Sequence, residues 1–276
     1  MTLTHAHISA QLHAAGLSPR RALGQNFVVD ANTVRRIARL CGVGPTDSVL
    51  EIGAGLGSLT LALAESGAQI TAIEIDETIV PLLRDNVAQC PNVTVVQADA
   101  MTIDWSQLAD PSRAWHLVAN LPYNVATPMI ADILDTVPQI KEFFVMVQRE
   151  VGERLAGAPR TKAYGAVSVK VAFWGRAEVV GMVPASVFLP KPNVESALVR
   201  IVRHDQPLDP SVRPTELFSL VRTGFAKRRK MLRGALAGLV TQAQFNTAGI
   251  ESTARAEELS VHEWIRLYKV VYEEHT

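Results

Sequence analysis

The chain of 276 residues is long enough for one large domain or for a large and a small one, and 48% of it is hydrophobic. Its 27 lysines and arginines balance 27 aspartates and glutamates, so contact with nucleic acid would require a local basic cluster. Cys41 and Cys90 lack the spacing of a zinc site and are too few for a disulfide framework, which predicts two buried thiols. No segment has signal-peptide character or membrane-spanning length, so we expect a cytoplasmic protein that binds no membrane.

Strand-like and helix-like segments alternate through most of the sequence, which is typical of an α/β fold with a doubly wound, Rossmann-like sheet. The later strands of this sheet can run antiparallel to the others. Short apolar or β-branched runs predict strands at 49–52, 70–74, 93–96, 116–119, 143–147, 177–183 and 196–202. Helical spacing of apolar residues predicts helices at 59–64, 79–87 and 126–137.

The strand pattern ends near residue 204. Residues 205–210 form a polar, proline-marked linker, and the segments 217–225, 230–240 and 261–272 then have the spacing of amphipathic helices. We therefore expect a small helical C-terminal domain. At the other end of the chain, the histidines within residues 1–15 predict a mobile leader, because no acid or cysteine is spaced to complete a metal site.

A glycine-rich loop follows the first predicted strand, in the sequence Glu-Ile-Gly-Ala-Gly-Leu-Gly at 51–57. Glycines at 53, 55 and 57 let a ligand approach the backbone at the carboxyl end of a strand, although a tight turn without a ligand has the same pattern. A dinucleotide fingerprint requires its third glycine at position 58, where this chain has serine. The spacing therefore favours a nucleoside ligand without a pyrophosphate.

Acidic residues follow the next two predicted strands. Glu74 stands about 20 residues after the first glycine, where a carboxylate accepts hydrogen bonds from both ribose hydroxyls. Asp99 is placed to accept a hydrogen from an adenine amino group. Asp76 fits a helix cap better than a ligand contact, and either acid taken alone would also fit an ordinary strand terminus.

The most specific segment is Asn-Leu-Pro-Tyr-Asn at 120–124, after the fourth predicted strand. Proline forces a turn that would aim the Asn120 amide and the Leu121 carbonyl at one point, with the Tyr123 ring beside it. The two acceptors could take both hydrogens of an exocyclic amine while the ring stacks on the base. Such acceptors would localise the amine lone pair toward an incoming methyl group.

Five motifs together resemble, in chain order, those of the ribosomal RNA adenine dimethyltransferases over about residues 18–203. They are Leu-Gly-Gln-Asn-Phe at 23–27, the loop at 51–57, the segment at 120–124, Lys-Ala-Tyr-Gly at 162–165 and Phe-Leu-Pro-Lys-Pro-Asn-Val-Glu-Ser at 188–196. The resemblance is stronger to the branch that acts on the small ribosomal subunit. The macrolide-resistance branch more often has isoleucine in place of Leu121 and usually lacks the 162–165 segment.

The resemblance implies an S-adenosylmethionine-dependent enzyme that dimethylates the N6 amino groups of two adjacent adenines in the 3′-terminal hairpin of 16S rRNA during ribosome biogenesis. It implies that Asn26 and the backbone at Val28 close over the cofactor and that Phe188 helps to sandwich the target base, although plain core is the commoner role of such a phenylalanine. The further cofactor contacts that it implies are Gly53, Glu74, Asp99 and Asn120, and the glycine loop adds Gly55.

The linker, the change of pattern and the resemblance together divide the chain into an N-terminal leader and cofactor-closing segment at 1–29, a catalytic methyltransferase domain at 30–204 and a helical domain at 205–276. Two positions depart from the small-subunit branch. Proline is common there in place of Ala54, and a basic or aromatic residue is common in place of Ala22 or Leu23. Neither departure removes a functional group.

An RNA substrate requires phosphate contacts, and the best source is a basic cluster in the helical domain, although a solvated helix junction has the same composition. This cluster comprises Arg222, Lys227, Arg228, Arg229, Lys230 and Arg233. The expected partner is 16S rRNA in the immature small subunit, bound by a monomer. The chemistry requires in-line transfer to an unstacked adenine in a dry site and needs neither a metal nor a covalent nucleophile.

Three alternatives share some of these features. A macrolide-type methyltransferase would apply the same chemistry to large-subunit RNA. A nicotinamide oxidoreductase has the same fold class, but the serine at 58 and the 120–123 segment argue against it. A non-catalytic ribosome-assembly factor would bind an immature subunit through the same surfaces.

Overall fold

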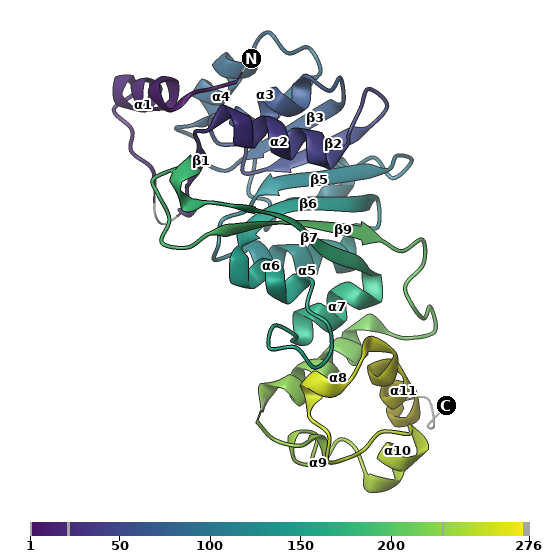
Figure 1. Cartoon of the computed structure of the whole chain (residues 1–276). Helices are drawn as coiled ribbons and strands as arrows, with labels where there is room; N and C mark the ends of the chain where they lie inside the picture. The colour runs from purple at the N-terminus through teal and green to yellow at the C-terminus, as the bar shows by residue number, and fades with distance from the viewer. Residues whose placement is uncertain (1, 21–22, 228, 273–276) are drawn as a thin grey trace. The chain divides into compact units, whose positions relative to one another are not determined.

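The computed structural model describes residues 2–20, 23–227 and 229–272, and the chain folds as two compact units (Figure 1). Unit 1 comprises Met1–Gly152 and Val179–Ile201, and unit 2 comprises Glu153–Glu178 and Val202–Thr276. The divisions after residues 29 and 204 that the sequence suggests remain predictions.

A seven-stranded sheet in the order β4-β3-β2-β5-β6-β9-β7 confirms the predicted α/β fold. Strands β4, β3, β2, β5 and β6 pair in parallel with their neighbours, and all seven predicted runs fall within strands. The carboxyl ends of β2, β3 and β5 therefore meet at one edge of the sheet. The strands are β2 (Ser48–Ile52), β3 (Gln69–Glu74), β4 (Val93–Gln97), β5 (Trp115–Asn120), β6 (Ile140–Gln148), β7 (Gly175–Val183) and β9 (Ser196–Arg203).

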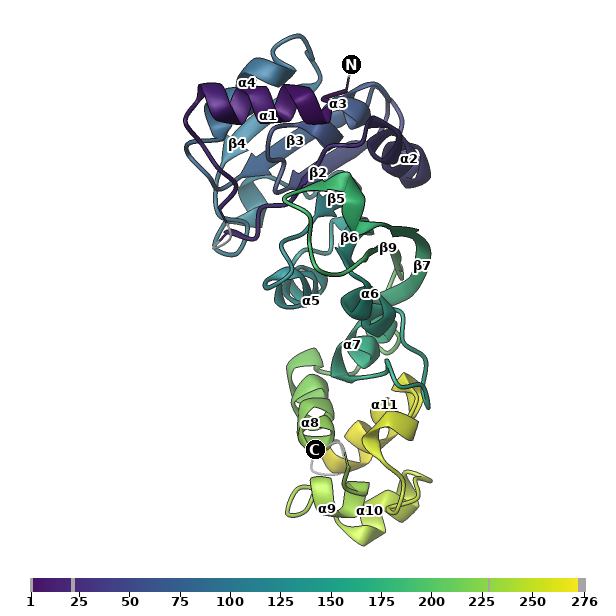
Figure 2. The ribbon, with the colours of Figure 1, turned by 60° about the vertical axis from the view of Figure 1, so that its left-hand side comes forward.

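Helices cover both faces of the parallel strands, and α2 and α5 lie on opposite sides of them in Figure 2. The sequence analysis assigned no helix to 31–41, but Asp30 caps α2 by accepting from the Thr33 backbone, and left-handed Gly42 ends it. Val34 and Ile37 of α2 are buried with the sheet residues. The helices are α2 (Ala31–Cys41), α3 (Ser58–Ala64), α4 (Val80–Val87) and α5 (Ala126–Thr136), with a 3₁₀ turn at Trp105–Gln107.

The N-terminal residues form helix α1 (His5–Ala14), so the prediction of a mobile leader at the three histidines is wrong. Ile8 and Leu12, four residues apart, are buried in a core cluster that also contains side chains of α4. The Gln11 and Asn86 side chains add hydrogen bonds of 2.6 and 3.1 Å between the two helices. The burial of these two residues and the hydrogen bonds to α4 therefore hold this short helix in unit 1.

Unit 2 is helical, as predicted for the C-terminal part of the chain, and its core surrounds the fully buried Trp264. Helix α8 contains the predicted segment 217–225, and α11 matches the prediction at 261–272. The predicted helix at 230–240 is only α9, because Met231 pairs with Arg255 and Gly238 has a φ of 83°. The elements in or bordering this unit are α6 (Arg149–Leu155), α7 (Ala166–Trp174), α8 (Pro214–Ala226), α9 (Leu232–Ala235), α10 (Gln242–Thr247), a 3₁₀ turn at Ala256–Glu258, and α11 (Val261–Tyr272).

Candidate active site

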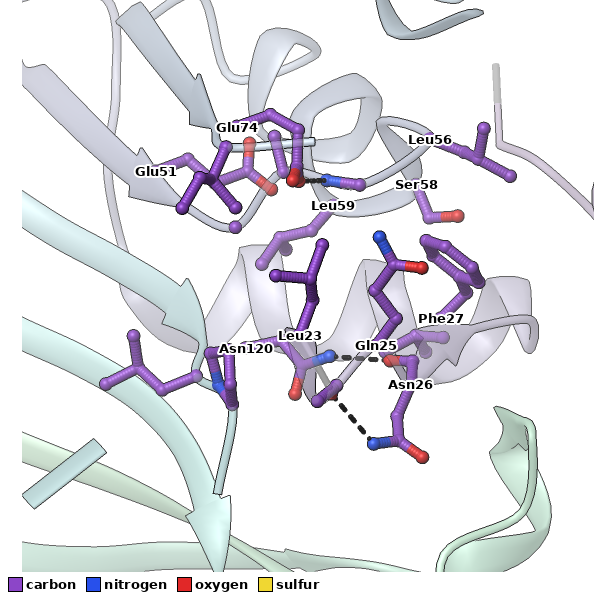
Figure 3. A pocket seen from close by; sticks show the side chains of 18 of the residues that line it. Leu23, Gln25, Asn26, Phe27, Glu51, Leu56, Ser58, Leu59, Glu74 and Asn120 are labelled. Atoms are coloured by element: carbon purple, nitrogen blue, oxygen red, sulfur yellow. Dashed lines mark hydrogen bonds between the residues drawn. The ribbon is translucent and has the colours of Figure 1, made fainter. Parts of the chain in front are cut away.

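Two cavities open at the carboxyl edge of the sheet in unit 1, and they share Leu23, Gly53, Ile75 and Pro122 in their walls. The first cavity, shown in Figure 3, extends over the glycine loop and the 120–123 segment. The second cavity lies toward the end of β4 and is lined by Asp99. The structure thus brings together residues of three predicted motifs, at 23–27, 51–57 and 120–124, and the predicted acids Glu74 and Asp99.

The glycine loop forms the floor of the first cavity. Gly53 and Gly55 have φ angles of 73° and 58°, which favour glycine, and the backbone N–H groups of Gly53 and Ala54 donate to the Ile73 carbonyl. A Cβ added at Gly55 would lie 3.0 Å from the Phe27 ring. The loop therefore presents bare backbone to the cavity, as the sequence predicts.

Glu74 lines the first cavity at the end of β3 and is 5% exposed. Its carboxylate accepts hydrogen bonds from the Gly55 N–H at 2.8 Å and from the Asp76 N–H at 2.9 Å. Burial raises the pKa of Glu74, and these backbone donors oppose that effect. The carboxylate is thus held in place between the glycine loop and the end of β3.

Asp76 is a structural residue, but the prediction that it caps a helix is wrong, because the N-cap of α4 is Ile79 and no side chain caps that helix. Although burial opposes its ionisation, hydrogen bonds from Thr78 and from the Gln25 side chain lower the pKa of Asp76. Arg20 lies 3.4 Å from the same carboxylate. Asp76 therefore ties the segment before β1 (Phe27–Val28) to the end of β3.

Asp99 lines the second cavity beyond the end of β4. Its Oδ1 accepts a hydrogen bond of 2.8 Å from the Met101 backbone N–H. A carboxylate has several acceptor positions, so this contact fixes the side chain and leaves further capacity for a donor in the cavity.

The Asn120 side chain has its orientation set by the segment before β1. Its Nδ2 donates to the Asn26 carbonyl at 2.9 Å, which leaves Oδ1 as an acceptor beside the first cavity (Figure 3). The Leu121 N–H is taken by the Met146 carbonyl at 3.0 Å, while the Leu121 side chain is buried. The Leu121 backbone is therefore held at the end of β5.

Tyr123 also lines the first cavity, and its hydroxyl lies 3.1 Å from the Ser196 Oγ. Ser196 is fully buried at the start of β9. The sequence analysis did not single out this serine, and only its place at the end of the fifth motif could have drawn attention to it. Tyr123 follows β5, whereas Ser196 belongs to β9. The contact between the two hydroxyls therefore fixes the position of the tyrosine ring relative to a second strand.

The segment 23–28 lies against both the 120–124 motif and the glycine loop. A Cβ added at Gly24 would lie 2.8 Å from the Pro122 Cβ, so the segment packs directly on the turn of the 120–124 motif. Phe27 and Val28 form β1, which pairs antiparallel with β8 (Phe188–Leu189). Asn26 and Val28 line the first cavity, but the Asn26 side chain donates to the Gly24 carbonyl at 3.0 Å.

Phe188 is 4% exposed and belongs to a core cluster with side chains of α2 and β2. Among the described residues, it does not line either of the two cavities. Its side chain has the place of a core residue here, and a role in holding the target base stays a prediction.

The basic cluster lies in unit 2, on the end of α8, on α9 and on the connection between them. Arg222, Lys227, Arg229, Lys230 and Arg233 are exposed, and Arg228 lies outside the described residues. The bridge between Met231 and Arg255 adds another exposed arginine beside this cluster. No sequence signal pointed to Arg255, because a backbone pairing across the helical unit brings it there.

The 162–165 motif has a structural place in unit 2. Tyr164 is 2% exposed, and its hydroxyl donates to the Leu259 carbonyl at 2.8 Å.

Within the described ranges, the structure contains no group of three or more His, Cys, Asp or Glu residues that could hold a metal ion. In that same part of the chain, no helix has the length and apolar character needed to cross a membrane.

Comparison with known proteins finds one family over nearly the whole chain. The family described as ribosomal RNA adenine dimethylase matches residues 16–273. A protein of Bifidobacterium longum named ribosomal RNA small subunit methyltransferase A is 44% identical over 275 residues, covering 93% of this chain and 89% of the relative. The protein of the same name from Cutibacterium acnes is 46% identical over 270 residues, covering 93% and 90%.

Two solved structures are similar over most of the chain. The crystal structure of the 23S rRNA methyltransferase ErmE has a TM-score of 0.69 and 28% identity, covering 89% of this chain and 99% of that one. A dimethyladenosine transferase from Plasmodium falciparum has a TM-score of 0.72 at 20% identity, covering 86% and 94%, and supports the fold.

Proposed function

Because the chain belongs to the ribosomal RNA adenine dimethylase family, we propose that it dimethylates the N6 amino groups of two adjacent adenines in the 3′-terminal hairpin of 16S rRNA. The observation that carries the proposal is the meeting of the 120–123 segment with the acid-lined cavities at one sheet edge. The small-subunit target is supported by the two relatives named small subunit methyltransferase A, which are 44% and 46% identical to this chain. The 23S rRNA methyltransferase ErmE is 28% identical to it.

The residues around the two cavities fit S-adenosylmethionine, whose positively charged sulfur would supply the methyl group. Glu74 would accept from the ribose hydroxyls with the lone pairs that its two backbone donors leave free. Asp99 would accept from the adenine amine in the second cavity. The bare backbone at Gly53 and Gly55 would allow the cofactor to approach closely. Asn26 and Val28, which line the same cavity, would close over the cofactor.

The target amine would be held by the Asn120 Oδ1 and the Leu121 carbonyl, with its base stacked on Tyr123. The contact to the Asn26 carbonyl supports this role for Asn120, because it turns the amide oxygen rather than the amide nitrogen toward a ligand. These acceptors would draw both hydrogens aside and direct the nitrogen lone pair at the methyl group. The second transfer requires the same site to accept a monomethylated amine.

RNA phosphates would be contacted by Arg222, Lys227, Arg229, Lys230 and Arg233, together with Arg228 and the neighbouring Arg255. Clustering on one exposed segment supports this assignment in a chain without net charge. Binding would take place on the immature small subunit, during ribosome biogenesis in the cytoplasm.

The proposal is tested by transfer of labelled methyl groups to hypomethylated small subunits and, separately, to large-subunit RNA. We expect label in dimethyladenosine of 16S rRNA, and Asn120→Ala should lower the single-turnover rate more than RNA affinity, because the amide acts mainly in the transition state. Binding of each ligand to Asn120→Ala must be measured in parallel. Label in large-subunit RNA alone would reassign the enzyme, and subunit binding without transfer would indicate an assembly factor.

The RNA-binding surface is tested by reversing Arg229 and Lys230 to glutamate. Binding to the subunit should weaken and lose part of its salt dependence, while cofactor affinity stays at the parent value. Reversal of Arg84 and Arg113, two exposed arginines of unit 1, is the control with the same change in charge. A salt dependence unchanged from the parent would place the RNA contacts elsewhere.

A further inference from the structure

Helix α2, which lies in front of the sheet of unit 1 in Figure 1, has an arginine-rich surface that the proposed function does not use. The helix contains Arg35, Arg36 and Arg39 and no acidic residue. All three arginine side chains are exposed, while the opposite side of the helix is buried with sheet residues. We call these three arginines the α2 face.

The spacing of two of these arginines is unfavourable for an isolated helix. Arg35 and Arg39 are four residues apart, so their side chains are neighbours on the helix surface, and like charges at this spacing destabilise a helix. Arg39 is in the last turn, where a positive charge suits the helix dipole, but Arg35 is not. Because the helix has no acid of its own to offset the repulsion, the pair indicates a partner that brings negative charge.

The same two arginines line a hollow between α2 and the end of α3. The hollow is also lined by Glu65 and by Ser66, so two positive charges and one negative charge face it. Arg36 does not line the hollow, and its guanidinium donates to the Met182 carbonyl at 3.3 Å. A guanidinium has five N–H donors, so this contact holds Arg36 in place and leaves most of its donors for an anion.

The other side of the sheet in unit 1 has the opposite charge. A second hollow, lined by residues of α5 and of the segment 101–106, contains Asp104 and Asp132, and Asp135 on α5 is also exposed. Because α2 and α5 lie on opposite sides of the strands in Figure 2, a polyanion is favoured on the α2 side. A second copy of the chain could pair the two sides, but such a head-to-tail contact gives rings or open chains rather than the commoner two-fold dimers.

Resting on the RNA substrate of the proposed function, we propose that the α2 face is a second RNA-binding surface, which contacts phosphates of the small ribosomal subunit. Phosphate contacts orient a protein on RNA without reading its sequence. Helix α2 follows β1, whose Val28 lines the first cavity, so these contacts act on the unit that must place the target base. The phosphates also offset the repulsion between Arg35 and Arg39.

The first test is binding of hypomethylated small subunits to the double variant Arg35→Gln/Arg39→Gln over a series of potassium chloride concentrations. Each lost phosphate contact should lower the slope of log affinity against log salt by roughly one, so the slope should fall by about two. Glutamine keeps the helix propensity, and the repulsion is removed, so Tm should stay equal or rise. The affinity for S-adenosylmethionine should not change.

Two further double variants are the controls. Arg84→Gln/Arg113→Gln removes two exposed arginines of unit 1 with the same change in charge and should keep the parent slope. Arg35→Lys/Arg39→Lys keeps both charges and should also bind the subunit with a slope close to that of the parent. An unchanged slope in Arg35→Gln/Arg39→Gln, or an equal fall in the Arg84 and Arg113 variant, overturns the proposal. A loss of Tm or of cofactor binding on glutamine substitution would make the arginines structural and overturns it as well.

The second test identifies what lies opposite the α2 face on the subunit. Leu40, next to Arg39, is 41% exposed, so Leu40→Cys in a Cys90→Ser background can carry a tethered iron chelate that cleaves nearby RNA with hydroxyl radicals. We expect cleavage of 16S rRNA in the bound subunit. The same chelate on Ser106→Cys, in the acidic hollow on the other side of the sheet, should cleave it much less.

The other occupants of the α2 face would give different results. Subunit binding without RNA cleavage from position 40 would assign the face to a protein of the subunit. A concentration-dependent mass that Arg35→Gln/Arg39→Gln abolishes would assign it to a second copy of the chain, and either result overturns the proposal. If the parent binds and methylates subunits, these results remove only this inference, whereas a parent that does neither removes the proposed function too.

Discussion

Replacing Glu74 with alanine should cost stability as well as cofactor affinity. The carboxylate accepts from two backbone N–H groups, those of Gly55 and Asp76, and it is 5% exposed. A buried donor left unpaired costs about 1 to 3 kcal/mol, and water that enters through the cavity should keep each loss near the lower limit. We therefore expect the free energy of unfolding to fall by about 2 kcal/mol.

Cofactor affinity should fall together with stability, because two ribose hydroxyls lose a charged acceptor. The expected loss is about 1 to 3 kcal/mol, which is roughly 5- to 150-fold in Kd. Urea denaturation measures the first quantity, and titration calorimetry with 5′-methylthioadenosine measures the second. A variant as stable as the parent would show that the loop donors find other partners, and unchanged affinity would remove Glu74 from the ribose contact.

Three further changes probe separate parts of the structure. Tyr123→Phe and Ser196→Ala should each destabilise the protein by about 1 kcal/mol, and the double variant should cost less than their sum, because one hydrogen bond is shared. Tyr123→Phe should nevertheless retain most methylation, since the stacking ring remains. Gly224→Ala should destabilise unit 2 by about 1 to 2 kcal/mol, because the added Cβ would lie 2.5 Å from the Trp264 ring and overpacking outweighs the gain in helix propensity. The free energy of unfolding of the parent should fall as pH rises from 4.5 to about 8, by at most about 1.4 kcal/mol per pH unit, relative to Glu51→Gln.

Each of these changes has its own control. Additive effects of the Tyr123 and Ser196 substitutions would show that their hydroxyls act independently. Gly234→Ala in α9 is the matched control for Gly224, because its added Cβ would meet nothing nearer than Lys230 at 3.9 Å. For the pH series, folding holds the proton on Glu51 more tightly than the unfolded chain does, so stability is lost as pH rises, and equal slopes in parent and variant would contradict this.

The sheet could be predicted because each strand carries its own pattern. Buried parallel strands are continuous apolar runs, and the run at 49–52 is wholly buried in β2. The segment 230–240 shows why other predictions failed. Its apolar spacing is helical, but the Leu232 and Arg233 N–H groups donate to the carbonyls of Ala254 and Ser252. A pairing partner about 20 residues away in the sequence leaves no trace in the local spacing.

The sequence could predict which residues form the candidate site, but not how their side chains are oriented. The residues of the glycine loop, Glu74 and Asn120 line one cavity because parallel strands end at a common edge. The direction of the Asn120 amide could not be predicted, since it depends on a carbonyl 94 residues earlier in the chain.

The interleaving of the two units along the chain limits how the protein can be shortened. Residues 153–178 lie within the boundaries of the strand-rich part of the sequence, yet their side chains at Val169 and Phe173 belong to the same core as Leu217 and Phe218. A chain ended at residue 204 would keep α7 and lose those partners. Such a fragment would display an apolar helix face to solvent, so a minimal catalytic fragment would also need a designed replacement for residues 153–178.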